Sequence, residues 1–126
     1  MSHTIIYNSE EHAIESKIQG DFTLDTAKEI MAEFALIAKE KDCVLFLSDY
    51  SEATLKLSTM EIHGLPKIIL DIFASSGLDV RRFRRALVAT KDLKDYLFFE
   101  TVTANRGQNT KVFYDVDEAK KWLYKK

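Results

Sequence analysis

The sequence predicts an α/β fold: a mixed, mostly parallel sheet of about five strands, with an N-terminal antiparallel hairpin and four helices. After two opening strands, strand-like and helix-like periodicities alternate regularly, as in parallel strands joined by right-handed helical crossovers. A central apolar run at 43–49 suits a strand buried on both faces. The 126 residues, of which 46% are hydrophobic and 30% charged, fit one domain covering 1–126.

The first elements are a strand pair and a long helix. Short strands are predicted at 4–7 and 12–20, and Gly20 ends the second. From Thr23 the apolar residues recur every three or four positions, which indicates one face of a helix. Thr23 is the expected N-cap, and Asp25 lies in the first turn, where the helix dipole favours an anion.

The middle of the chain continues with a strand and a second helix. The strand at 43–49 contains the single cysteine, Cys43, which we expect to be a buried small residue. We interpret the polar segment 50–54 as a loop. Pro66 lies inside the pattern of the next helix, where it removes a backbone hydrogen bond. We therefore expect a kink or a restart there, and an end at Gly77.

The last part repeats the alternation. A strand is predicted at 81–90, a helix at 92–107, a short strand at 111–115 and a closing helix at 115–126. The entry of the first of these strands, 81–85, holds four arginines in five residues. Because strand side chains alternate between faces, these arginines would be split, and we interpret them as solvated residues that pair with surface carboxylates.

The hydroxyl pair Ser58 and Thr59 opens the second predicted helix. Ser58 suits an N-cap, and Glu61 three residues later completes a capping box. The same free backbone amides and helix dipole are also suited to holding a phosphate. Capping alone is the favoured interpretation, and an anion or phosphorylation site at Ser58 and Thr59 is the alternative.

These elements together resemble the STAS-domain superfamily, and in particular its SpoIIAA-like branch of small stand-alone bacterial proteins. The resemblance rests on the strand 43–49, the hydroxyl pair, the strand 85–90 and the ending 112–123, in that order over nearly the full length. It implies the anti-sigma-factor-antagonist-like fold and a non-catalytic module for regulation or protein binding. In those antagonists a partner kinase phosphorylates a hydroxyl residue at the start of the helix after the central strand.

By position, Ser58 or Thr59 matches that phosphoacceptor. The antagonists typically have an acidic residue before the hydroxyl pair and a glycine after it, whereas this chain has Lys56 and Met60. Members of the wider branch are also compared with Sec14-like lipid carriers. That comparison implies a second function, binding of a small apolar ligand or lipid beneath the helices.

Two further groups of residues are candidate sites. The helix predicted at 92–107 has more aromatic residues than one helix face can bury against a sheet. A surface between two copies of the chain is therefore the alternative to ordinary packing for Tyr96, Phe98 and Phe99. Amide and guanidinium donors gather just after the same helix. These donors belong to Asn105, Arg106 and Gln108, which could bind a carboxylate or phosphate. An ordinary loop is the favoured interpretation.

Several classes of function are not expected. The net charge of −2 gives no general attraction to nucleic acid. The chain start lacks the features of a signal peptide and no apolar run is long enough for membrane insertion, so we expect a cytoplasmic protein. We expect no cofactor, and no metal because His3, His12 and His63 lack ligand-spaced partners. An enzyme is not expected either. As a third possible function, after regulation and ligand binding, an enzyme would use Asp49, Ser51 and His63.

Overall fold

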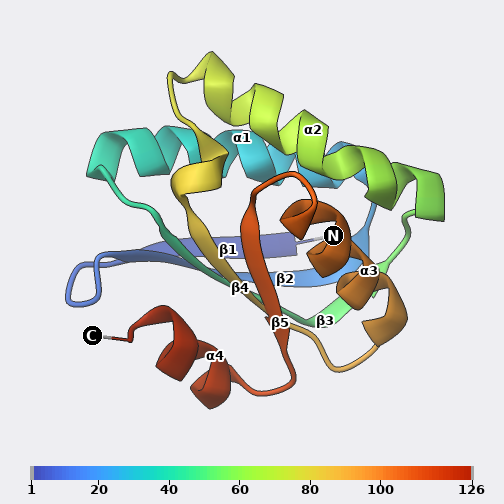
Figure 1. The fold of residues 1–126 in the computed structure, drawn as a ribbon. Coiled ribbons are helices and arrows are strands. Elements are labelled where there is room, and N and C mark those ends of the chain that lie inside the picture. The colour runs from blue at the N-terminus through green and yellow to red at the C-terminus, as the bar shows by residue number, and fades with distance from the viewer. Residues whose placement is uncertain (1, 126) are drawn as a thin grey trace.

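The computed structural model describes residues 2–125, which form one five-stranded sheet and four helices (Figure 1). The strand order is β1-β2-β3-β4-β5, with β1 antiparallel to β2 and the other neighbours parallel. The predicted fold class is therefore confirmed. The strands are β1 (Ser2–Asn8), β2 (Ala13–Phe22), β3 (Leu45–Leu55), β4 (Arg84–Val88) and β5 (Asn109–Phe113).

The helices lie on both faces of the sheet. In Figure 1, α1 and α2 cover one face and α4 lies on the opposite one. The larger core is built between the sheet and α1, α2 and α3, and a smaller core joins α4 to β3 and β4. The helices are α1 (Leu24–Lys41), α2 (Thr59–Ser75), α3 (Leu93–Ala104) and α4 (Val116–Leu123).

The helix boundaries follow local signals in the sequence. Thr23 caps α1, since its side chain accepts a hydrogen bond from the Thr26 amide. Gly77 and Gly107 have positive φ angles of 78° and 72° after α2 and α3, the left-handed conformation that glycine adopts without strain. The prediction for Pro66 was wrong in part: α2 runs through this buried residue without a restart.

Two predicted strand boundaries also change. The segment 50–54 is not a loop, because β3 continues to Leu55 and pairs with β2 beyond a register shift between Lys17 and Gln19. A 3₁₀ turn (Val80–Arg82) replaces the start of the strand predicted at 81–90. For the polar segment 50–54, long-range pairing with β2 supplies the backbone hydrogen bonds that make it part of a strand.

Candidate functional site

The carboxyl ends of β2, β3 and β4 meet at one edge of the sheet, and the loops there are joined. The carboxylate of Asp92 accepts a hydrogen bond from the Leu55 amide at 3.1 Å, and Lys91 Nζ donates to Thr54 Oγ1 at 3.0 Å. Asp92 has a left-handed φ of 56°, an unusual value for a residue other than glycine. These contacts tie the end of β3 to the loop before α3, at the edge where α/β folds commonly bind ligands.

Ser58 and Thr59 lie at this edge and differ in their hydrogen bonding. Ser58 Oγ accepts from the Glu61 amide at 3.1 Å, and Glu61 Oε1 accepts from the Ser58 amide at 2.8 Å. The predicted capping box is thus present. Thr59 begins α2, and within residues 2–125 its hydroxyl has no hydrogen-bond partner. Both residues are exposed. The serine hydroxyl is therefore engaged by the cap, and the threonine hydroxyl is free.

Removal of the cap should be measurable. We expect Ser58→Ala to lower the free energy of unfolding by about 1 kcal/mol, because an N-terminal amide of α2 loses its acceptor. Thr59→Ala is the matched control and should change stability by less than about 0.5 kcal/mol, since its exposed hydroxyl has no hydrogen-bond partner among residues 2–125. Urea unfolding of both variants checks this; equal losses would contradict the assignment of the cap.

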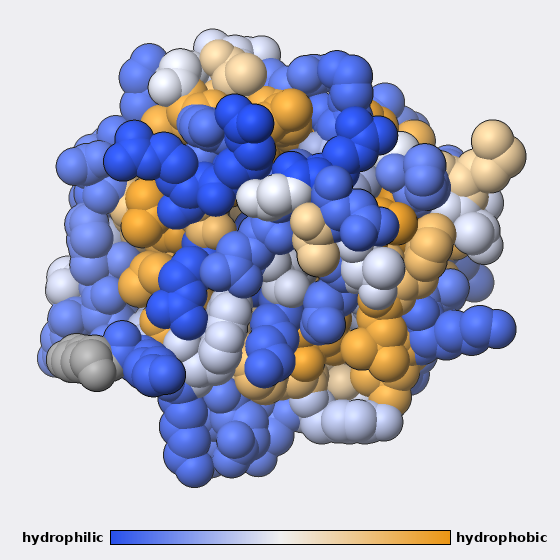
Figure 2. Space-filling view, viewed as in Figure 1, coloured by the Kyte–Doolittle hydropathy of each residue, from blue (hydrophilic) through white to orange (hydrophobic). Residues whose placement is uncertain are grey.

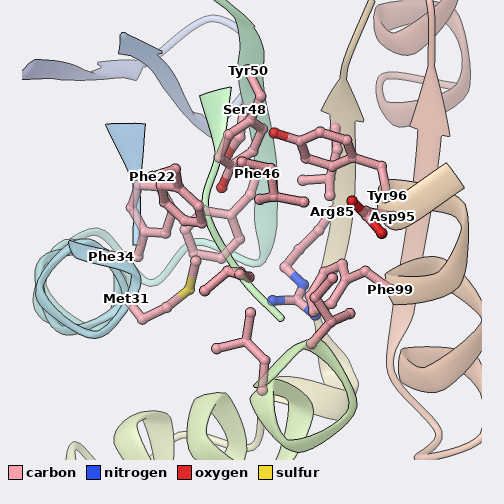
Figure 3. A pocket seen from close by; sticks show the side chains of 15 residues that line it. Phe22, Met31, Phe34, Phe46, Ser48, Tyr50, Arg85, Asp95, Tyr96 and Phe99 are labelled. Carbon is pink, nitrogen blue, oxygen red and sulfur yellow. The ribbon is translucent and has the colours of Figure 1, made fainter. Parts of the chain in front are cut away.

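A second feature of this region is an apolar pocket between the sheet and α1, α2 and α3 (Figure 3). The enclosed volume is about 40 Å³. Leu55, Leu57, Asp95 and Phe99 line it and keep partial exposure, so they mark its opening. The deeper walls are mostly apolar, and their aromatic residues are Phe22, Phe34, Phe46, Tyr50 and Tyr96.

Arg85 lies in this pocket and is 5% exposed. Its Nη2 donates to Gln108 Oε1 at 3.0 Å and to Thr110 Oγ1 at 2.9 Å, and its guanidinium carbon lies 5.8 Å from the Phe99 ring centroid. No carboxylate of residues 2–125 lies within ion-pair distance of it. Burial lowers the pKa of Arg85 to about 10. The prediction that 81–85 is solvated was wrong for this arginine, because its strand position faces the helices.

Two tyrosines in the pocket are also perturbed. Burial raises the pKa of Tyr50 to about 12, although the nearby Arg85 partly offsets this. The pKa of Tyr96 is raised by burial and by the nearby Tyr50 and Asp92. In the described part of the chain, the Tyr96 hydroxyl is the buried side-chain polar atom without a hydrogen-bond partner. Figure 3 shows it pointing toward Tyr50. Both phenols are thus held in their neutral form.

These pKa shifts predict a loss of stability in alkali. Unfolded tyrosines ionise near pH 10, and because the folded pKa values of Tyr50 and Tyr96 are higher, the unfolded state loses protons first. Stability should fall between pH 10 and 12, by about 1.4 kcal/mol per pH unit for each tyrosine. Arg85 has the opposite effect on stability and offsets the contribution of one tyrosine. Its folded pKa of about 10 lies below its ordinary value, so above pH 10 the folded state loses this proton first.

Urea unfolding at pH 9, 10 and 11 checks this expectation. Tyr50→Phe should flatten the decline, whereas Tyr114→Phe should leave it unchanged, because Tyr114 is 68% exposed. An identical decline in wild type and Tyr50→Phe would show that this buried phenol does not cause it.

The residues of the predicted polar loop differ in their burial. Asn105 and Arg106 are exposed, but Gln108 is buried, with its Nε2 donating to the Pro66 carbonyl at 2.9 Å. Gln108 therefore supports Arg85 from inside and is not a loop ligand beside Asn105 and Arg106. Its role depends on residues 23 and 42 positions away, so the local sequence gave no signal for it.

The predicted aromatic interface changes in a similar way. Tyr96 is 4% exposed and belongs to the core, so it cannot contribute to a surface between two copies. Phe98 and Phe99 are half-buried, while Leu97 is 51% exposed. On the face that Figure 2 shows, hydrophobic residues lie in patches separated by hydrophilic ones. The part of the interface prediction that stays open therefore concerns Phe98 and Phe99.

The catalytic alternative gains no support from the geometry. Asp49 Oδ1 accepts a hydrogen bond from the Ser51 amide at 2.9 Å. His63 is exposed on α2, and no hydrogen bond in the range 2–125 joins it to either residue. No cluster of three or more potential metal ligands was found among the described residues. Cys43 is buried, as predicted.

Solved structures with a similar fold match nearly the whole of this chain. The anti-sigma-factor antagonist SpoIIAA in its unphosphorylated form matches 99% of this chain and 100% of its own, with a TM-score of 0.59 and 9% identity. Phosphorylated Bacillus SpoIIAA, a cell-fate determinant, matches 96% and 99% of the two chains, with a TM-score of 0.54 and 8% identity. The chain therefore has the STAS/SpoIIAA-like fold.

A further similar structure is an uncharacterised protein of the DUF3478 family from Shewanella loihica PV-4, which has a SpoIIAA-like fold. The match covers 97% of this chain and 92% of that one, with a TM-score of 0.58 and 22% identity. No protein-family model and no curated protein matches the sequence. Within residues 2–125, no helix has the length and apolar character required to cross a membrane.

Proposed function

We propose that this chain, as one domain of residues 1–126, is a non-catalytic cytoplasmic module that regulates a protein partner. The observation that carries the proposal is the exposed hydroxyl pair at the start of α2, on the fold of an anti-sigma-factor antagonist that has been solved with and without phosphate. Phosphate at this edge would change both charge and shape on a surface open to a partner.

The hydrogen bonding favours Thr59 over Ser58 as the acceptor. Phosphate on Ser58 would remove the cap and meet the Glu61 carboxylate, which lies 2.8 Å from the Ser58 amide. Phosphate on Thr59 would keep the capping box and lie at the helix N-terminus, where the dipole favours negative charge. The regulatory switch would then leave the fold itself unchanged.

Mass spectrometry of the protein from its native cells tests this proposal. Trypsin cleavage after Lys56 and Lys67 releases residues 57–67 as one peptide, and fragmentation distinguishes phosphate on Ser58 from phosphate on Thr59. We expect phosphate on Thr59, and a Thr59→Glu variant that changes crosslinking to a partner in those cells. Thr101→Glu is the control, because Thr101 is exposed on α3 away from this edge. An unmodified peptide together with unchanged crosslinking would contradict the proposal.

We also propose self-association through the half-buried Phe98 and Phe99, with exposed Leu97 beside them. Sedimentation at high protein concentration is the direct measurement. A dimer that Leu97→Glu dissociates would support this, and a monomer at every concentration would contradict it.

The pocket supports a second candidate function, the binding of a small apolar ligand. Mostly apolar walls enclose it, and its opening lies between the start of α2 and α3. Ligand sites in proteins are concave, mostly apolar and equipped with a few polar groups. Native mass spectrometry of the purified protein should detect a copurified apolar molecule; a protein of bare mass that also binds no added apolar compound would contradict this candidate.

A further inference from the structure

The pocket contains two polar groups that the protein leaves without full partners. Guanidinium has five N–H donors, yet the hydrogen bonds of Arg85 to residues 2–125 come from Nη2 alone. The buried Tyr96 hydroxyl has no partner in the same range. Buried polar groups in proteins are nearly always hydrogen-bonded, so the unpartnered Tyr96 hydroxyl indicates a missing polar atom in this pocket, where Arg85 has further N–H donors.

The charge of Arg85 is the more informative of the two. A buried cation is ordinarily paired with a carboxylate, because the loss of hydration is otherwise uncompensated. Here its acceptors are the neutral Gln108 and Thr110. The acidic residue that lines the pocket, Asp95, is half-buried at its opening and forms no ion pair with Arg85. The pocket therefore carries a positive charge without an ion-pair partner among residues 2–125, inside mostly apolar walls.

We propose that this pocket binds an amphipathic monocarboxylate of the fatty-acid type, with its carboxylate on the Arg85 guanidinium. The planar guanidinium fork matches a carboxylate, and the pair gains strength where water is excluded. The apolar body would lie against Phe22, Phe34 and Phe46, which line the pocket on the side away from Phe99 (Figure 3). This inference rests on the second candidate function and adds the chemistry that selects the ligand.

The enclosed volume of about 40 Å³ is far below the roughly 300–1,000 Å³ typical of small-molecule sites. Binding therefore requires the walls at the opening to move apart, and the half-buried Leu57 and Phe99 are the side chains placed to do so. If this open state is a minor population, the observed affinity is reduced by that fraction. The comparison between two ligands of one shape cancels this cost.

The test compares decanoate with decanamide, which has the same apolar body and an uncharged head. Isothermal titration calorimetry at pH 7.5 should show decanoate binding about ten- to a hundredfold more tightly to the wild-type protein, the range expected for a hydrogen bond to a charged group. Arg85→Met should remove this preference, and Arg85→Lys should retain part of it. Asp95→Asn should tighten decanoate binding alone, because a carboxylate at the opening is lost.

Arg84→Met is the matched control. Arg84 lies on the opposite face of the sheet, where its Nη2 donates to the Trp122 carbonyl at 2.7 Å, and it does not line the pocket. This variant should keep the wild-type preference. If the wild-type protein binds both compounds equally, or if Arg85→Met keeps the preference, the inference is wrong while apolar binding stands. If neither compound binds, the second candidate function fails with it.

A measurement on the wild-type protein covers the case in which Arg85→Met does not fold. Decanoate labelled with ¹³C at its carboxyl group reports its own ionisation by NMR. A guanidinium partner should lower the pKa of the bound carboxylate below the pKa of free decanoate measured in the same buffer. Burial in an apolar pocket without such a partner would raise that pKa, and this result would overturn the inference.

Discussion

Replacement of Phe46 by alanine should lower the free energy of unfolding by about 3–5 kcal/mol, the usual cost of removing a buried aromatic side chain. Phe46 is 1% exposed on β3, at the centre of the larger core. Its ring centroid lies 5.2 Å from that of Phe34, 6.0 Å from Phe73 and 5.4 Å from Phe83. One substitution thus removes contacts with α1, α2 and the segment before β4.

The matched control is Tyr114→Ala, because Tyr114 is 68% exposed and its truncation opens no cavity. Urea unfolding of both variants is the measurement. We expect a change below about 0.5 kcal/mol for Tyr114→Ala. A loss below about 1 kcal/mol for Phe46→Ala would mean that the core does not depend on this ring.

Gln108→Leu should have an effect of similar size for an electrostatic reason. The substitution removes the Oε1 acceptor of a buried guanidinium and the Nε2 donor to the Pro66 carbonyl. Hydrogen bonds to charged groups contribute about 1.5–3 kcal/mol, and breaking a buried charged contact costs about 3–5 kcal/mol when the charge is left uncompensated. With Thr110 still bonded to Arg85, we expect a loss of about 2–4 kcal/mol.

A double-mutant cycle separates this cause from simple loss of packing. If the uncompensated charge of Arg85 is the cause, Arg85→Met in the Gln108→Leu background should restore part of the lost stability, because both polar partners are then apolar. Asn105→Ala, two residues before the left-handed Gly107, is the exposed control and should be nearly neutral. Purely additive losses for Gln108→Leu and Arg85→Met would show that the two side chains are not coupled.

The capping box of α2 illustrates what a local pattern can predict. Ser58 and Glu61 are three residues apart, and their hydrogen bonds require only the first turn of one helix. The same holds for the cap at Thr23 and for the positive φ angle at Gly77. The order of strands and helices followed from periodicity, and it sufficed for the fold class. Such features depend on neighbours within about one turn.

The pocket could not be predicted in this way. Arg85 looked like its neighbours in a run of arginines, and Gln108 looked like part of a polar loop. Their burial depends on a 3₁₀ turn that delays β4, on the face that β4 presents to the helices, and on contacts 23 residues apart along the chain. Tyr96 was a candidate for a homodimer interface and lies in the core.

The sequence by itself thus determined the α/β class, the order of the elements and the helix-start hydroxyls, because these depend on residue spacing along one segment. Only the tertiary structure decided which arginine is buried and that an apolar pocket containing this arginine lies under α2 and α3. It also decided that, within residues 2–125, Ser58 is hydrogen-bonded in the cap while the Thr59 hydroxyl has no partner. The reason is that burial and pairing are set by segments far apart in the chain, which become neighbours only when the sheet has formed.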